Sequence, residues 1–224
     1  MEKDQSQTAK TRIYNLIILD KSGSMTGIRT AAYEGCNEVI NGIRAAAEKH
    51  ADTQEQFVSL LLFDSQSMPY IFRCAPASQT EALHDKDYVP CACTPLLDAV
   101  GMALTDLKKE VDKYEDAVGM VTIITDGYEN ASRHFDADEV KRMVEHEKEK
   151  YGWEFIFLGA DIDAVKTAGS IGIDSSRAAN YRKDTVGNET MFASVDAAIT
   201  MARTCPTIDG SWKAEVDKDF EERR

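Results

Sequence analysis

The sequence contains no long hydrophobic run, and this absence already limits where the chain can act. A helix needs about 20 predominantly apolar residues to span a bilayer, and no segment of the 224 residues approaches that length. Residues 1–7, MEKDQSQ, have no apolar core, so we expect neither a secretory signal nor membrane insertion. No internal repeat and no segment rich in Pro, Gly or Ser is visible, which favours one large domain.

Basic residues are in the minority. The chain has 26 Lys and Arg against 39 Asp and Glu, a net charge of −13. Nucleic acids and anionic membranes attract basic surfaces, so the composition argues against both as partners. It does not argue against a partner carboxylate bound to a metal ion, because the ion sets the local potential.

Cysteines are few, and they lack the spacing of a disulfide framework. Five is an odd number, and free thiols in a reducing compartment are the simplest account, so we expect a cytoplasmic protein. Two catalytic signatures are also absent: there is no Walker A sequence and no histidine in a nucleophile-like context. The cysteines are Cys36, Cys74, Cys91, Cys93 and Cys205.

Apolar runs and helical spacing alternate along the chain. This alternation predicts an α/β fold with a doubly wound, mostly parallel six-stranded sheet, helices on both faces and one antiparallel edge strand. In the strand order 3-2-1-4-5-6, the first and fourth strands are neighbours where the order reverses. We expect strands at 13–19, 57–63, 69–74, 118–125, 153–159 and 178–182, and helices at 28–49, 95–113, 137–150, 162–171 and 188–203.

The most informative motif follows the first expected strand. Residues 20–26 read DKSGSMT, directly after the apolar run 13–19. Asp20, Ser22 and Ser24 are spaced by two, so a tight loop can turn all three side chains toward one point. Oxygen ligands of this kind suit a hard divalent cation such as Mg²⁺.

Two later segments supply further oxygen ligands. Thr94 opens the helix that precedes the fourth strand, and Asp126 follows that strand. Ligands of doubly wound sheets bind at the carboxyl ends of the strands, where the strand order reverses. Three separate segments are therefore expected to converge on one crevice.

The order of these residues, D-x-S-x-S, then T, then D, resembles the metal-ion-dependent adhesion site (MIDAS) of von Willebrand factor A (vWA) domains. T-P-L and T-D-G are the usual contexts there, and a single-domain, bacterial-type member is implied. The resemblance covers about residues 11–205, with a polar extension at 1–10 and a loose polar tail at 206–224. The metal ligands it implies are Asp20, Ser22, Ser24, Thr94 and Asp126.

The resemblance implies a binding module and not an enzyme. Ser22 and Ser24, joined by Thr94 on ligand binding, would touch Mg²⁺ or Mn²⁺, while the carboxylates act directly or through water. The ion would then capture an Asp or Glu of an unidentified protein partner, and no small-molecule substrate is expected. The expected cytoplasmic setting differs from that of the adhesive members, so adhesion itself is not carried over.

Each residue also has a structural interpretation. The loop at 20–24 could cap the following helix, Thr94 before Pro95 suits an N-cap, and Asp126-Gly127 is an ordinary turn. Their occurrence together at strand exits favours the metal site. A vWA scaffold with a vestigial site, binding through a helix face, remains an alternative.

The segment before Thr94 departs from the family. Glycines are common there, whereas this chain has Cys91-Ala92-Cys93. Two thiolates are half of a tetrahedral zinc site, and His84 is the sole nearby imidazole, so cysteines that only pack are favoured over zinc ligands.

A second alternative is a Mg²⁺-dependent phosphohydrolase of the dehalogenase type. It would also place an aspartate after its first strand, but it normally needs a second Asp where this chain has Ser22. Its usual lysine could be supplied by Lys141, for example. Other acidic residues lie at strand ends: Asp64 could rim the crevice, and Asp161 and Asp163 could hold a second ion, although helix capping is favoured.

Overall fold

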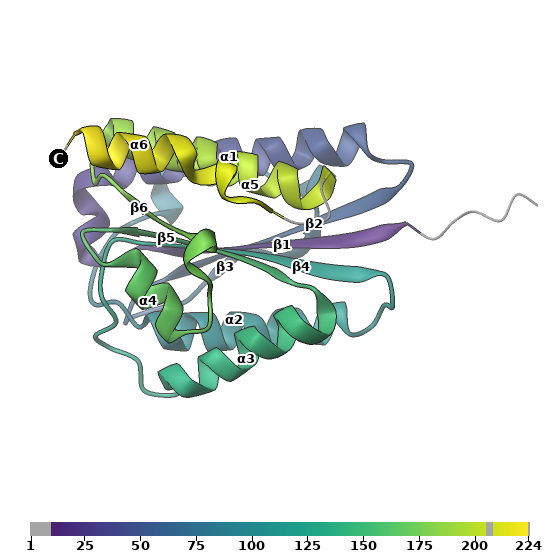
Figure 1. Ribbon diagram of the computed structural model, residues 1–224, viewed down its shortest axis with the longest axis horizontal. Coiled ribbons are helices and arrows are strands. Elements are labelled where there is room, and N and C mark those ends of the chain that lie inside the picture. Colours follow the sequence, from purple (N-terminus) through teal and green to yellow (C-terminus); the bar gives the residue numbers. More distant parts are fainter. Residues whose placement is uncertain (1–9, 205–207, 224) are drawn as a thin grey trace, which may run out of the picture.

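The molecule is built on one six-stranded sheet (Figure 1). A computed structural model of the chain describes residues 10–204 and 208–223. The strand order is β3-β2-β1-β4-β5-β6, and every pairing is parallel except that of β2 with β3. This confirms the predicted fold class. The strands are β1 (Thr11–Asp20), β2 (Gln54–Phe63), β3 (Tyr70–Pro76), β4 (Ala117–Thr125), β5 (Glu154–Ala160) and β6 (Ala178–Tyr181).

Helices cover both faces of the sheet (Figure 1). One layer holds α1 (Arg29–Lys49), α5 (Thr185–Thr204) and α6 (Ala214–Glu222), and the other holds α2 (Leu96–Val111), α3 (Ala137–Tyr151) and α4 (Ala164–Ser170). None of the described helices is long and apolar enough to cross a membrane. The 3-10 helices are η1 (Gly23–Ile28), η2 (Ala77–Gln79), η3 (Asp85–Asp87), η4 (Ser175–Arg177) and η5 (Gly210–Lys213).

Strand β1 is the centre of the core. Its residues alternate between the two helical layers: Ile17 and Leu19 pack in one hydrophobic cluster, Leu16 and Ile18 in the other. A strand covered on both faces needs apolar side chains on both sides, which explains its continuous apolar run.

The C-terminal segment is more ordered than the sequence analysis expected. Instead of a loose polar tail, residues 208–223 form η5 and α6, and Trp212 and Val216 are buried. Few apolar residues separated by charged ones give a weak sequence signal, and their burial depends on the distant β6 and α5. The domain boundaries themselves stay a prediction, and residues 1–9 of the extension and Cys205 lie outside the described residues.

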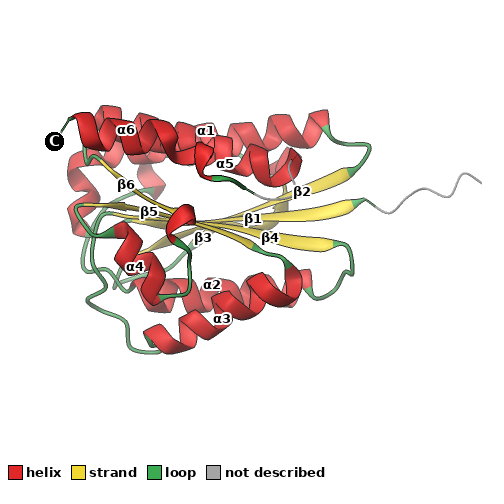
Figure 2. Cartoon of the chain, viewed as in Figure 1, coloured by secondary structure: helices red, strands yellow, loops and turns green. Residues whose placement is uncertain are grey.

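The carboxyl ends of the parallel strands meet at one edge of the sheet, where loops gather at the left of Figure 2. In the β1–β4 register Leu19 lies beside Ile124, so Asp20 and Thr125 follow at the same level. The residues predicted to bind a cation therefore start from neighbouring strands.

Candidate metal site

Asp20, the last residue of β1, is fully buried and holds the loop that follows it. Its Oδ1 accepts a hydrogen bond from the Ser22 amide at 2.6 Å, and its Oδ2 accepts one from the Thr125 hydroxyl at 2.6 Å. Burial raises the pKa of Asp20 to about 6, against the lowering effect of the bonds from Thr125 and Ser22, and nearby Asp126 raises it further. Asp20 thus shapes the loop and keeps a carboxylate at its base.

The two serines of the loop form a polar chain with Asp126. Ser22 Oγ lies 3.0 Å from Ser24 Oγ, and Ser24 Oγ donates to Asp126 Oδ1 at 2.5 Å. Ser22 and Asp126 are buried, while Ser24 is exposed. The structure therefore brings four predicted ligands together, Asp20 included, and the chain of oxygens opens to solvent at Ser24, its middle member.

Thr94, the fifth predicted ligand, lies over the turn that follows Asp126. A Cβ on Gly127 would sit 2.9 Å from Thr94 Oγ1, so only glycine allows the hydroxyl to approach this closely. Asn130 fixes the Thr94 backbone. Its side-chain Oδ1 accepts from the Thr94 backbone amide at 2.8 Å, and its backbone amide donates to the Thr94 carbonyl at 3.1 Å. Thr94 is buried within the same crevice.

Thr94 does not cap helix α2. The N-cap position is taken by Pro95, and the first-turn amides of Leu97 and Asp98 donate to Glu129 Oε2 at 2.9 Å and Ser132 Oγ at 3.0 Å. The structural interpretation of Thr94 as an N-cap is therefore not supported, and its hydroxyl is available for another role.

The segment before Thr94 is bound to the serine loop by the backbone. The Cys91 amide donates to the Lys21 carbonyl at 2.9 Å, and the Gly23 amide donates to the Ala92 carbonyl at 3.0 Å. Ala92 has φ of 60°, in the left-handed region that favours glycine. The backbone of Ala92 thus adopts a conformation that suits glycine, and the fold tolerates the strain.

Asp126 carries a carboxylate oxygen that lacks a hydrogen bond. Asp126 Oδ2 is buried and accepts no well-aligned hydrogen bond, although Lys183 Nζ lies 2.8 Å away. The contact is therefore an ion pair by distance without hydrogen-bond geometry. A buried carboxylate oxygen left in this state is unusual in folded proteins, and a bound ion is one of the explanations for it.

A second lysine–aspartate pair lies on the other side of the serine loop. Lys21 and Asp64 are both buried and form an ion pair, and Lys21 Nζ also donates to Ser67 Oγ at 3.1 Å. Asp64 Oδ1 accepts from the amides of Gln66 and Ser67 at 2.7 and 2.8 Å. Burial acts to raise the pKa of Asp64, but the bonds from Lys21 and these amides outweigh it and lower the pKa. Asp64 is thus bound internally.

The alternative ligands do not gather into a metal site. Cys91 donates to Asp64 Oδ2 at 3.2 Å, while Cys93 is exposed and not packed. Asp163 caps α4 by accepting from the Lys166 amide at 3.0 Å, as favoured. In the part of the chain that the structure describes, no three His, Cys, Asp or Glu side chains converge on one point that could hold a metal ion.

The predicted site does not depend on a cluster of three His, Cys, Asp or Glu side chains. It combines two carboxylates with three hydroxyls, all of them oxygens, which fits Mg²⁺ or Mn²⁺ and not zinc. The buried, unbonded Asp126 Oδ2 beside the exposed Ser24 is the observation that fits a cation best. Ser22, Ser24, Thr94 and the two aspartates are the residues that would hold it.

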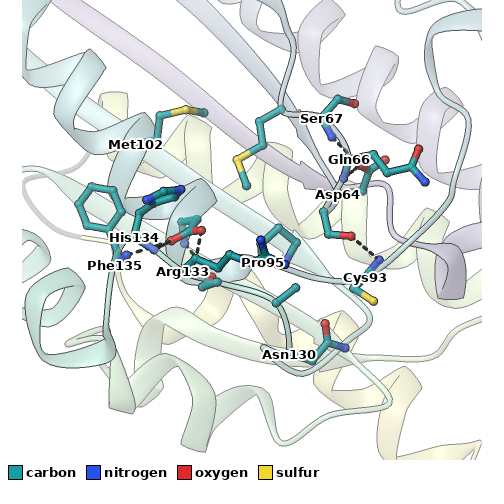
Figure 3. Close-up of a pocket in the computed structure, with 15 residues that line it drawn as sticks. Asp64, Gln66, Ser67, Cys93, Pro95, Met102, Asn130, Arg133, His134 and Phe135 are labelled. Atoms are coloured by element: carbon teal, nitrogen blue, oxygen red, sulfur yellow. Dashed lines mark hydrogen bonds between the residues drawn. The ribbon is translucent and has the colours of Figure 1, made fainter.

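A hollow of about 930 Å³ opens beside the Thr94 segment (Figure 3). Met102, His134 and Phe135 lie on one side of it, and Asp64, Gln66 and Ser67 lie on the other, with Pro95 between the two groups in this view. Its remaining lining residues include Met68, Asp98 and Arg133.

Asp98 organises the wall of this hollow. Its carboxylate accepts from the amides of Arg133, His134 and Phe135 at 2.8, 2.8 and 2.9 Å. Burial acts to raise the pKa of Asp98, but these three bonds lower it. Since Asp64 and Asp98 are both satisfied internally, the charge left for a ligand comes from the exposed Arg133, beside apolar side chains and exposed polar ones such as Gln66.

Solved structures share this architecture. The chain is similar to the pilus adhesin SpaC from Lactobacillus rhamnosus GG (TM-score 0.62, 13% identity, 87% of this chain and 31% of that one). It is also similar to the PilB minor pilin from Streptococcus sanguinis (TM-score 0.56, 11% identity, 87% of this chain and 63% of that one). A third similar structure is proximal thread matrix protein 1 from the mussel byssus (TM-score 0.54, 11% identity, 84% of this chain and 46% of that one).

The chain has a vWA-like fold. This is the fold of the vWA-containing proteins named above, of whose lengths the chain spans 31 to 63%. No family model and no curated protein matches the sequence. At such low identities the likeness concerns the fold, and the metal site rests on the residues of this chain.

Sequence reasoning missed two residues of the site. Thr125 donates a hydrogen bond to Asp20, and its place at the end of the strand, directly before Asp126, was a usable signal. Lys183 had no signal, since it follows a short edge strand 57 positions beyond Asp126 in the sequence.

Proposed function

We propose that this chain is a metal-ion-dependent protein-binding module, in which Mg²⁺ or Mn²⁺ at a MIDAS-type site captures an acidic residue of a partner. The observation that carries the proposal is the chain of oxygens from Ser22 through Ser24 to Asp126, which ends in a buried carboxylate oxygen without a hydrogen bond. The neighbouring folds are those of adhesins and pilins, which is consistent with a binding role.

The chemistry of the donor set explains why a partner is needed. Two carboxylates neutralise a divalent ion, but three neutral hydroxyls are weak donors, and Mg²⁺ favours six oxygens. A carboxylate from a partner supplies both a strong donor and negative charge. The ion's role is electrostatic attraction of that carboxylate, and no covalent bond changes.

The hollow beside Thr94 extends this surface. Met68, Met102 and Phe135 offer apolar contacts, and exposed Arg133 offers positive charge on a chain whose net charge is negative. We propose that it receives the partner residues that flank the metal-bound acid. The cytoplasmic location expected from the free thiols is likewise a proposal.

For the phosphohydrolase alternative, the structure places a lysine near the site but no second acidic residue where the general acid is needed. Lys141 lies on α3 beside Glu145, away from the site, whereas Lys183 contacts Asp126. Ser22 still stands where the general acid would be needed. Hydrolysis of a generic phosphoester by the wild-type chain, lost in Asp20→Asn, would favour the enzyme over the binding module.

Thermal unfolding tests the metal site directly. At one hundred times the dissociation constant, Mg²⁺ adds about 2.7 kcal/mol to the free energy of unfolding, a rise in Tm of roughly 5–10 °C for a domain of this size. We expect this rise for wild type and for the matched control Asp52→Asn, which removes an exposed carboxylate. We expect none for Asp126→Asn.

Two other results would change the conclusion. An equal rise in Asp126→Asn would place the ion elsewhere, and no rise in any well-folded variant would indicate a vestigial site. Where the rise is seen, proteins retained on immobilised wild type in Mg²⁺, released by EDTA and absent with Asp126→Asn, identify the metal-dependent partner.

A further inference from the structure

Lys183 places a positive charge at the carboxylate that would hold the cation. Its Nζ lies 2.8 Å from Asp126 Oδ2 and 3.7 Å from Asp161 Oδ2. The side chain of Asp126 is fully buried in this pair, that of Lys183 is 24% exposed and that of Asp161 is 65% exposed. The ammonium therefore sits at the mouth of the crevice, between a buried carboxylate and one that faces solvent.

The backbone around Lys183 is held in place, so its reach to Asp126 is not a chance surface contact. On one side, Arg182 donates to the Phe220 carbonyl of α6 at 2.5 Å. On the other, Asp184 accepts from the Gly187 amide at 2.8 Å and pairs with Arg223 at 2.8 Å. These contacts fix the segment between β6 and α5 from which the Lys183 side chain extends.

We propose that Lys183 is a tethered cation that competes with the divalent ion for Asp126 and thereby sets the affinity of the site. This inference rests on the proposed metal site. A divalent ion and an ammonium bound to the same carboxylate repel each other, so binding of one weakens the other. Because Lys183 remains partly exposed, its ammonium can leave Asp126 for solvent or for Asp161 when the ion binds.

The competition has a consequence for metal dependence. A site with its own positive charge releases the ion more readily than one without it, so capture of a partner becomes sensitive to the metal concentration. The partner's carboxylate then adds the negative charge that favours the ion over the lysine.

Calorimetric titration of the EDTA-stripped protein with Mg²⁺ tests the inference. We expect Lys183→Met and Lys183→Gln to bind Mg²⁺ about tenfold more tightly than wild type, on the Coulomb scale for charges a few Å apart. Lys183→Arg keeps the charge and should stay near wild type. Lys166→Met is the matched control, since it removes an exposed lysine of α4 and changes the net charge equally.

The outcomes separate this inference from the proposed function. Tighter binding in Lys183→Met and Lys183→Gln alone supports it. Affinities equal to those of wild type and Lys166→Met, or weaker, overturn the competition while leaving the metal site intact. No Mg²⁺ binding in any protein overturns both.

Wild-type protein gives a second readout that does not depend on a variant folding. An ammonium held in an ion pair reacts slowly with acetic anhydride. We expect saturating Mg²⁺ to increase the acetylation rate of Lys183 several-fold, measured by mass spectrometry, and to leave Lys166 unchanged. An unchanged rate at Lys183 in protein that binds Mg²⁺ would show that the ion does not displace it.

Discussion

Two lysine–aspartate pairs flank the serine loop, and they differ in how completely they are satisfied. In the Lys21–Asp64 pair the side chains are 8% and 0% exposed, and each has further hydrogen bonds to Ser67 or to backbone amides. In the Lys183–Asp126 pair the lysine is 24% exposed, and Asp126 Oδ2 accepts no hydrogen bond. The first pair is closed to ligands and the second is open.

This difference indicates that the Lys21–Asp64 pair stabilises the fold, whereas the Lys183–Asp126 pair belongs to the candidate site. A buried pair with all its hydrogen bonds in place is costly to break, because either partner left alone is an uncompensated buried charge. A pair with one solvent-facing partner and one unsatisfied oxygen can exchange that partner for another cation. A lysine and an aspartate therefore hold the serine loop in place on one side, and on the other side they form the part of the site that can bind a cation.

The largest expected effect comes from making the same substitution in both pairs. In EDTA, Lys21→Met should lower the free energy of unfolding by about 3 kcal/mol, because it leaves Asp64 buried without its counter-charge. Lys183→Met also leaves a buried aspartate, but it should lower the free energy of unfolding less, by about 1–2 kcal/mol, since Lys183 is partly hydrated and makes no aligned hydrogen bond to Asp126. Urea unfolding measures both. Equal losses would contradict the division into scaffold and site.

The positions that the sequence could predict are those with local signals. The apolar runs before Asp20 and Asp126 and the spacing of Ser22 and Ser24 indicated both the strands and the loop. Lys21 gave no such signal, because its burial depends on Asp64, 43 residues away, and a lysine in a loop is normally exposed. Helix α6 was missed for the same reason: its burial comes from distant elements.

The pH dependence of stability tests the Lys21–Asp64 pair in a second way, with a somewhat smaller expected effect. The pKa of Asp64 is lower in the folded chain than in the unfolded one, so its stabilising contribution is present above about pH 4 and is lost as pH falls through the folded value. Asp64→Asn should therefore be destabilising at pH 6, and its difference from wild type should shrink below about pH 4.

Urea unfolding in EDTA between pH 3 and 7 checks this expectation. The exposed Asp52→Asn supplies the control for general charge effects and should show little dependence. A wild-type advantage over Asp64→Asn that stayed constant down to pH 3 would mean that the charge of Asp64 is not what stabilises the loop.

The smallest expected effect on stability concerns the backbone of Ala92, whose carbonyl accepts a hydrogen bond from the serine loop. Ala92, at φ of 60°, is strained by about 1 kcal/mol or more, and glycine would relieve the strain while adding freedom to the unfolded chain. Ala92→Gly should therefore stabilise the protein by about 0.5–1 kcal/mol, whereas Ala131→Gly, in a loop without positive φ, should destabilise it by a similar amount. If the segment serves only to hold Thr94 in place, calorimetry should find the Mg²⁺ affinity of Ala92→Gly unchanged. A weakened affinity would show instead that the strained alanine presses the Thr94 hydroxyl toward Gly127 and belongs to the site.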